Sequence, residues 1–184
     1  MMYNSNDIVE VNELLNRFLP NDQVDTVLEV TPDYLKNKGI KGVITDLDNT
    51  LVAWNQPAAT PEVIEWFRVL REAGIEVTII SNNTEDRVSF FSKPLGIPFI
   101  SKARKPMQTA FKRAKKEMKL SGDELVVVGD QLLTDVFGGN RANLHTILVV
   151  PIVRTDGFFT RFNRKIERRI LHHFKKTGKL NWED

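Results

Sequence analysis

The sequence predicts one α/β domain in which a parallel sheet of about five strands is covered by helices on both faces, giving three layers. Short apolar runs rich in β-branched residues recur between Lys41 and Pro151, without the polar alternation of half-exposed strands. Helical patterns separate these runs, as in βαβ units. A length of 184 residues, 41% of them hydrophobic, suits a single domain. The strands are expected at residues 43–44, 77–80, 97–100, 125–128 and 146–150.

Four helices are expected between the strands, at residues 60–74, 84–93, 106–122 and from about residue 134. The first has complete boundary signals, with Thr60 as a cap, Pro61 at the first helical position and Gly74 at the end. The last is expected to be short because Gly138 and Gly139 interrupt its pattern.

Helical additions are expected at both ends of the core, so that one domain spans residues 1–184. The core is residues 41–154, preceded by an N-terminal extension at 1–40 and followed by a basic C-terminal extension at 155–184. The N-terminal extension carries two apolar stripes with helical spacing. They are formed by Val11, Leu14, Leu15 and Phe18, and by Val24, Val27 and Leu28.

The formal charge of +2 conceals an uneven distribution. Residues 1–150 hold 17 Lys and Arg against 20 Asp and Glu, whereas residues 151–180 hold 9 against 2. Within residues 158–176, basic side chains surround an apolar stripe. Such a helix can lie on an anionic membrane, bind nucleic acid or pack on its own domain, and nucleic acid is the least favoured of these. The stripe is formed by Phe162, Ile166, Ile170 and Phe174.

Several classes of protein are excluded by composition. The chain has no cysteine, so disulfides, thiolate metal sites and a cysteine nucleophile are absent. No charge-free stretch exceeds 13 residues, so no segment is expected to span a bilayer. The first 16 residues carry three acids and lack the pattern of a secretory signal. We therefore expect a cytoplasmic protein, with peripheral contact at the inner face of the membrane left open.

Two carboxylates, Asp46 and Asp48, follow the first expected strand in the string Thr45-Asp46-Leu47-Asp48-Asn49-Thr50. Ligands of a parallel sheet gather beyond the carboxyl ends of its strands. One carboxylate can act on an electrophile and the other beside a leaving group, while a divalent cation offsets their charge. The pair alone is weak evidence, since turns and helix caps use the same residue types.

The next two strand ends carry groups that bind anions. Ser81 and Asn82 follow the second strand at a helix start, where a hydroxyl and backbone N–H groups are available. Lys105 follows the third strand and precedes Pro106, and it is favoured over Lys102 and Arg104 for contact with an anion.

Asp130 and Asp135 follow the fourth strand and add oxygen ligands of the kind that hard cations prefer. A helix cap is an equally weighted alternative for Asp135. Trp54 is expected to pack, with substrate contact as the lesser alternative. Because these groups all follow strands of one sheet, the sequence predicts a single active site.

The order Asp46-x-Asp48-x-Thr50, Ser81, Lys105-Pro106 and Gly129-Asp130-x4-Asp135 resembles the four motifs of the haloacid dehalogenase (HAD) superfamily, most of whose members are magnesium-dependent phosphohydrolases. It is closest to subfamily IIIA and, within that, to the YqeG-type proteins, and it extends from about Leu14 to His172. The resemblance implies a Rossmann-like, HAD-like fold. A receiver domain places its lysine last, whereas here Lys105 precedes Asp130.

The resemblance also implies a role for each residue. Asp46 is the expected nucleophile that forms an aspartyl-phosphate, and Asp48 the general acid and then the general base. Ser81 and Lys105 are expected to bind phosphoryl oxygens, with Asn82 beside them.

The expected cofactor is Mg²⁺. The resemblance implies that it is held by the carboxylates of Asp46 and Asp130 and by the backbone carbonyl of Asp48, with Asp135 further out. Its charge lets an anionic nucleophile approach an anionic phosphate.

The substrate is expected to be a phosphomonoester that reaches an open site. Only 33 positions separate Asp48 from Ser81, and 24 separate Ser81 from Lys105, which leaves no room for a cap domain. YqeG-type proteins also resemble mitochondrial phosphatidylglycerophosphate phosphatases, which implies a phospholipid substrate at a membrane surface. The alternatives are a soluble metabolite phosphatase, a nucleic-acid-end phosphatase and a non-catalytic module that binds RNA or the ribosome.

Overall fold

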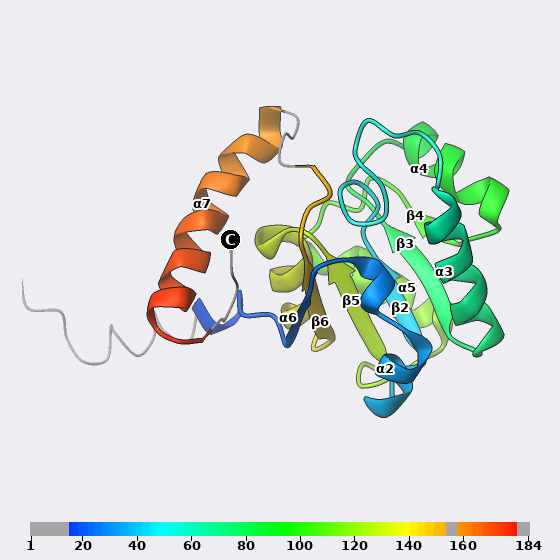
Figure 1. Ribbon diagram of the computed structural model, residues 1–184, viewed down its shortest axis with the longest axis horizontal. Coiled ribbons are helices and arrows are strands. Elements are labelled where there is room, and N and C mark those ends of the chain that lie inside the picture. The colour runs from blue at the N-terminus through cyan, green and yellow to red at the C-terminus, as the bar shows by residue number, and fades with distance from the viewer. Residues whose placement is uncertain (1–14, 154–157, 180–184) are drawn as a thin grey trace, which may run out of the picture.

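The computed structural model describes residues 15–153 and 158–179, and its centre is one parallel sheet (Figure 1). The strand order is β1-β6-β5-β2-β3-β4, and each neighbouring pair is parallel. The α/β class and the parallel sheet are therefore confirmed, with one strand more than the five expected. The strands are β1 (Asp22–Val24), β2 (Gly42–Thr45), β3 (Glu76–Ile80), β4 (Phe99–Ile100), β5 (Leu125–Gly129) and β6 (His145–Val149).

Strand β2 lies between two hydrophobic clusters, one on each face of the sheet. Successive residues of a strand point to opposite faces. Val43 belongs to the cluster that includes Trp66 and Phe67 of α3 (Pro61–Glu72). Ile44 belongs to the cluster that includes Phe111 of α5 (Gln108–Met118). Helices thus cover both faces, which gives the three layers that the sequence predicts.

The carboxyl ends of β2 and β5 lie side by side at the centre of the sheet. From β2 the chain continues outward through β3 and β4, and then returns to the opposite side of β2 to form β5 and β6. Ligands of open α/β sheets bind where the strand order reverses in this way. Asp46 follows β2 and Asp130 follows β5, so both acids lie at this point.

Two helices begin where the sequence predicts. The Thr60 hydroxyl accepts a hydrogen bond from the Val63 N–H at the start of α3, and Thr84 does the same for the Arg87 N–H in α4 (Glu85–Ser92). Each hydroxyl satisfies a backbone donor that has no partner within its helix. Helix α5 begins at Gln108, later than expected, because residues 104–107 form a turn.

The prediction of a second N-terminal helix at residues 24–28 was wrong. Val24 ends β1, which pairs with β6, and Val27 begins the 3₁₀ turn η1 (Val27–Glu29). A separate helix, α2 (Pro32–Asn37), follows with Thr31 as its cap. Val11 and Leu14 of the first predicted stripe lie outside the described residues, whereas Leu15 and Phe18 lie within them.

The fourth helix is short, as expected, but the two glycines that were expected to interrupt it lie inside it. The π-helical turn η3 (Leu132–Val136) leads into α6 (Phe137–Arg141). A Cβ atom on Gly138 would lie 2.7 Å from the Phe111 ring, and one on Gly139 would lie 2.5 Å from the Thr146 side chain. The glycines therefore allow α6 to pack closely against α5 and β6.

Helix α7 (Phe158–Lys176) packs on the domain through its second half. It lies beyond β6, at the opposite end of the sheet from α3 and α4 (Figure 1). Phe174 is fully buried, Ile170 and Leu171 pack against Leu132 and Leu148, and a Glu167 carboxylate oxygen accepts a hydrogen bond from the Leu133 N–H at 3.0 Å. Part of the apolar stripe is thus used within the domain, while the side chains of residues 158–164 lie outside the described set.

None of the helices within residues 15–153 and 158–179 combines the length and the apolar character that a membrane-spanning helix needs.

Candidate active site

The loop after β2 places Asp46 at the centre of the site. Its backbone N–H continues the ladder with a bond of 2.9 Å to the Val128 carbonyl of β5, and the residue is only 7% exposed. Asp48, two residues on, is nearer the surface, with a side chain 18% exposed. The two predicted carboxylates therefore differ in environment, the first buried and the second partly open to solvent.

Lys105 forms ion pairs with two acids, one that follows β2 and one that follows β5. Its Nζ atom lies 2.7 Å from Asp46 Oδ1 and 2.6 Å from Asp135 Oδ1, and its side chain is 4% exposed. The competing cations Lys102 and Arg104 are exposed at the surface. The structure thus brings Lys105 to the site, as the sequence predicts, and leaves the other two at its margin.

The ionisation of this group follows from burial and charge. Burial alone would lower the pKa of Lys105, but the carboxylates of Asp135 and Asp46 outweigh it, so the pKa lies above its ordinary value. Burial raises the pKa of Asp135 to about 6, which Lys105 opposes and the Asp46 charge reinforces. Lys105 is therefore a permanent cation between two carboxyl groups.

Asp135 is buried inside the π-helical turn η3, where it joins the acids of the site and also bonds the backbone at the start of that turn, as a cap does. Its Oδ2 accepts a hydrogen bond of 3.2 Å from the Gln131 N–H, and the residue is 2% exposed. A Cβ atom on Gly129 would lie 2.3 Å from Asp135 Cγ. The glycine at the end of β5 therefore provides the space that this carboxyl group occupies.

Three of the acids form a set with the chemistry of a divalent-cation site. Carboxylate oxygens of Asp46, Asp130 and Asp135 lie within 4.8 Å of one another, and all three residues are buried. Lys105 brings one positive charge to three carboxyl groups, and the Thr50 hydroxyl donates to Asp130 Oδ1 at 3.2 Å. Buried acids with this charge imbalance suit a hard divalent cation, which prefers oxygen ligands. The residues thus fit the expected Mg²⁺, with the Asp48 side chain outside the set.

The two predicted anion-binding residues after β3 have different roles in the structure. Ser81 is buried, and its hydroxyl accepts a bond of 3.1 Å from the Asn83 N–H. The Asn82 amide bonds the backbone of Lys105 at both ends, accepting from its N–H at 2.6 Å and donating to its carbonyl at 3.1 Å. Asn82 therefore fixes the loop that carries Lys105, which the sequence did not indicate.

Sequence reasoning missed Arg87, a residue of α4 that binds Asp48. Its Nη2 and Nε atoms donate to Asp48 Oδ1 at 2.9 and 3.1 Å, and Asn83 donates to Asp48 Oδ2 at 2.9 Å. Arg87 also donates to the Pro57 carbonyl at 2.9 Å. One signal in the sequence could have indicated Arg87. It lies in the first turn of the helix after Ser81, and this turn is at the same edge of the sheet as the predicted acids.

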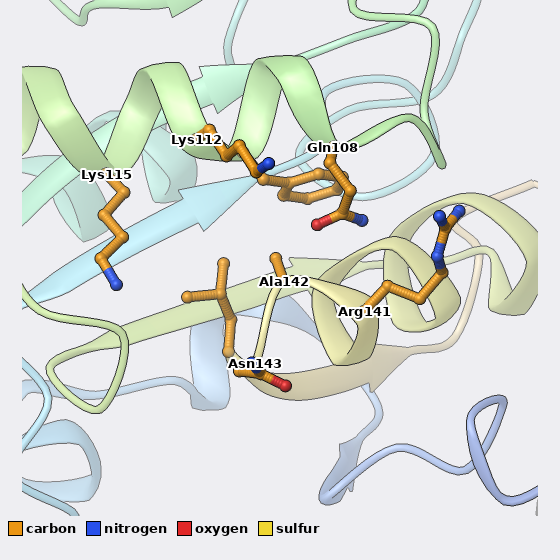
Figure 2. Close-up of a pocket in the computed structure, with 8 residues that line it drawn as sticks. Gln108, Lys112, Lys115, Arg141, Ala142 and Asn143 are labelled. Atoms are coloured by element: carbon orange, nitrogen blue, oxygen red, sulfur yellow. The ribbon is translucent and has the colours of Figure 1, made fainter.

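A separate groove of about 220 Å³ lies between α5 and the end of α6. In Figure 2, Gln108 extends from the start of α5 toward Arg141. The Gln108 amide donates to the Gly138 carbonyl at 3.1 Å and closes one end of the groove. None of the predicted site residues lines it. The candidate active site is therefore a cluster of charged side chains at the sheet edge and lies outside this groove.

The geometry agrees with a comparison of folds. The cobalt-bound deoxy-D-mannose-octulosonate 8-phosphate phosphatase of Haemophilus influenzae superposes with a TM-score of 0.52. The match covers 74% of this chain and 90% of that chain, at 19% sequence identity. The similarity shows that the two chains share the HAD-like, Rossmann-like fold.

Comparisons of sequence identify the family. A family model described as HAD-hydrolase-like matches residues 102–151. The chain is 30% identical over 171 residues to phosphatidylglycerophosphate phosphatase 1 of Arabidopsis thaliana, which covers 87% of this chain and about half, 49%, of that protein. It is 59% identical over 167 residues to the probable phosphatase YqeG of Bacillus subtilis (strain 168), covering 91% of this chain and 97% of that one. The chain therefore belongs to the YqeG-type phosphatases of the HAD superfamily and is a phosphatase.

Proposed function

We propose that this phosphatase hydrolyses phosphatidylglycerophosphate at a membrane surface, using Mg²⁺ and a phosphorylated Asp46. The observation that carries the chemistry is the position of the Asp46 carboxylate, which lies 2.7 Å from Lys105 Nζ and within one acid set with Asp130 and Asp135. A nucleophile that attacks an anionic phosphate needs positive charge nearby. At Asp46 this charge would come from Lys105 and from a cation held by the acid set.

In the first step an Asp46 oxygen attacks phosphorus. The bond from phosphorus to the leaving oxygen breaks as the aspartyl-phosphate bond forms. Asp48 gives its proton to the leaving oxygen, so that an alcohol departs. In the second step Asp48 takes a proton from water, the water oxygen attacks phosphorus, and the bond to Asp46 breaks to release inorganic phosphate.

The other side chains bind and orient the phosphoryl group. Lys105 compensates the charge on its oxygens, and the Ser81 hydroxyl, buried at the end of β3, supplies a hydrogen bond. Asn82 holds the Lys105 backbone in place. Asp46, Asp130 and Asp135, with the Asp48 backbone carbonyl, would hold the cation. Bound Mg²⁺ supplies charge neutralisation between the carboxylate nucleophile and the phosphate.

Two observations support a lipid phosphomonoester as the substrate. A relative 30% identical to this chain is named for phosphatidylglycerophosphate. Helix α7 also has exposed basic residues, Lys165, Arg168 and Arg169, while its residues Ile170 and Phe174 pack inward. Basic residues on a surface helix favour an anionic membrane.

The test measures release of phosphate from phosphatidylglycerophosphate in mixed micelles with Mg²⁺. The wild type should be active, and Asp46→Asn should lose about a thousandfold or more of the rate, as for loss of a nucleophile. Asp33→Asn, which changes an exposed acid of α2, should keep the wild-type rate. Faster hydrolysis of a sugar phosphate, a nucleotide or a 5′-phosphorylated oligonucleotide would refute the lipid substrate. Inactivity on every compound would instead favour a binding module.

A further inference from the structure

Exposed apolar side chains lie beside the candidate active site. Trp54 is 47% exposed and Ile152 is 51% exposed. They come from loops after different strands, β2 and β6, yet both are held by Asn49. The Trp54 N–H donates to Asn49 Oδ1 at 3.3 Å, and the Ile152 N–H donates to the Asn49 carbonyl at 3.0 Å. Asn49 directly follows Asp48, so the backbone at both apolar residues is tied to the loop that carries the expected general acid.

The loop after β4 adds two exposed cations and a third apolar side chain. Met107 is 54% exposed, and Lys102 and Arg104 are exposed as well. This loop is tied to the site, since the Lys102 N–H donates to the Asn83 carbonyl at 2.9 Å and Lys105 reaches Asp46. Neither Lys102 nor Arg104 forms an ion pair with a carboxylate of the described residues.

We propose that these side chains form the surface by which the enzyme docks on an anionic lipid membrane. The docking rim, as we call it, consists of Trp54, Lys102, Arg104, Met107 and Ile152. The proposal rests on the proposed lipid substrate and adds the face of the protein that meets it.

The composition of the docking rim favours lipid over other partners. Tryptophan is enriched where proteins meet the membrane–water interface. Moving isoleucine and methionine side chains from water into the acyl region lowers the free energy. Lys102 and Arg104 complement the negative charge of an anionic leaflet. Nucleic acid would use the cations but would gain little from exposed Ile152 and Met107.

The placement of the rim also explains access to a buried nucleophile. Asp46 is 7% exposed and follows β2, and the loops that carry the rim also follow the carboxyl ends of strands, so the rim lies on the same edge of the sheet as the nucleophile. Helix α7 begins at the same end of the molecule: the loop leaving β6 and the first turn of α7 lie at the top of Figure 1, as does the loop after β2.

The experiment measures co-sedimentation with vesicles of phosphatidylcholine, with or without phosphatidylserine, an anionic lipid that carries no phosphomonoester. The wild type should bind the anionic vesicles, and more weakly at high salt. The double variant Trp54→Ser/Ile152→Ser should bind at least about tenfold more weakly, because two apolar side chains no longer leave water. Trp54→Phe/Ile152→Leu should bind like the wild type.

A matched control removes an apolar side chain outside the rim. Phe90 of α4 is 62% exposed, and Phe90→Ser should leave vesicle binding unchanged. The charge variant Lys102→Asn/Arg104→Asn should reduce the salt-sensitive part of binding. Asparagine suits the left-handed backbone of these residues, with φ of 47° and 55°.

The soluble substrate p-nitrophenyl phosphate separates this inference from the proposed function. The rim variants should hydrolyse it at the wild-type rate, since they leave the charged site intact. Three results would overturn the docking rim, even if phosphatidylglycerophosphate is hydrolysed. The wild type does not bind the anionic vesicles, the double serine variant binds them as tightly as the wild type, or Phe90→Ser loses as much binding as the double serine variant. Failure to hydrolyse that lipid in detergent overturns the proposed substrate, whatever the vesicles show.

Discussion

Arg87 binds the carboxylate of Asp48 through hydrogen bonds. Two guanidinium nitrogens donate to Asp48 Oδ1, at 2.9 and 3.1 Å, while Asn83 donates to Asp48 Oδ2 at 2.9 Å. Both oxygens of the expected general acid are therefore engaged. The same arginine donates to the Pro57 carbonyl, which connects α4 to the loop after β2. Asp48 Oδ2 accepts one bond and keeps a lone pair for proton exchange, while Arg87 fixes the position of the carboxylate.

Arg87→Met should weaken catalysis in a way that depends on the leaving group. A misplaced Asp48 protonates the leaving oxygen poorly, so kcat/KM for an alkyl phosphomonoester such as glycerol 3-phosphate should fall about tenfold or more. For p-nitrophenyl phosphate, whose leaving group departs without a proton, the fall should stay within about threefold. Steady-state kinetics on both substrates makes the comparison. Arg71→Met, which removes a surface bond to the Leu95 carbonyl, is the control. An equal loss on both substrates would contradict a role through Asp48.

Magnesium should raise the melting temperature of the wild type. Binding at about 100 times Kd stabilises the folded state by about 2.7 kcal/mol, and in a domain of this size each kcal/mol raises Tm by about 2–4 °C. In Asp130→Asn the increase should disappear, because the cation loses a carboxylate of the buried set. Without magnesium the variant should be as stable as the wild type or more so, since one buried negative charge is gone.

Scanning calorimetry with magnesium and with a chelator measures these shifts. Asp123→Asn changes an exposed acid and should keep the wild-type response. An undiminished magnesium shift in Asp130→Asn would exclude Asp130 as a ligand.

Gly129→Ala should damage the site from the end of β5. The new Cβ atom would lie 2.3 Å from Asp135 Cγ, and β5 cannot move aside because β2 and β6 pair with it on either side. Asp135 must shift and lose its 2.6 Å contact with Lys105. Overpacking of this kind costs about 1–3 kcal/mol.

Urea unfolding and p-nitrophenyl phosphate hydrolysis should therefore both reveal the change. Gly74→Asn is the control, since a Cβ there meets nothing within 4 Å and asparagine tolerates the φ of +77°. If Gly129→Ala keeps the wild-type stability and activity, the Asp135 side chain can move to another position without harm to the site.

The central strands and the acids that follow them could be predicted because the signals are local. β5 is a continuous apolar run that ends at Gly129, and Asp130 comes next. β1 could not be found in this way. It is three half-buried residues long, with the polar pair Asp22-Gln23 and a single apolar Val24, and its pairing with β6 depends on residues more than 120 positions away. No local pattern encodes such a pairing.

The same distinction applies within the site. Lys105 could be singled out because it follows a strand and precedes a proline, whereas Arg87 looks like any basic residue on a helix. Its role arises only when α4 packs beside the loop after β2 and brings it to Asp48. The prediction that Gly138 and Gly139 interrupt the fourth helix failed for a related reason. Glycine has a low helix propensity, but close packing of α6 against Phe111 and Thr146 requires glycine at these two positions.

Phe174→Ala should detach the end of α7 from the domain. Phe174 is fully buried, and it lies one turn beyond Ile170 and Leu171, which pack against η3 and β6. Removing a buried phenyl ring costs about 3–5 kcal/mol when the surroundings do not collapse. Hydrogen exchange should therefore speed up across residues 165–176, with little change in β2 or β5. Ile166→Ala, at a side chain already 36% exposed, should leave exchange close to wild type. If Phe174→Ala leaves exchange in α7 unchanged, the helix is held by contacts other than its apolar side.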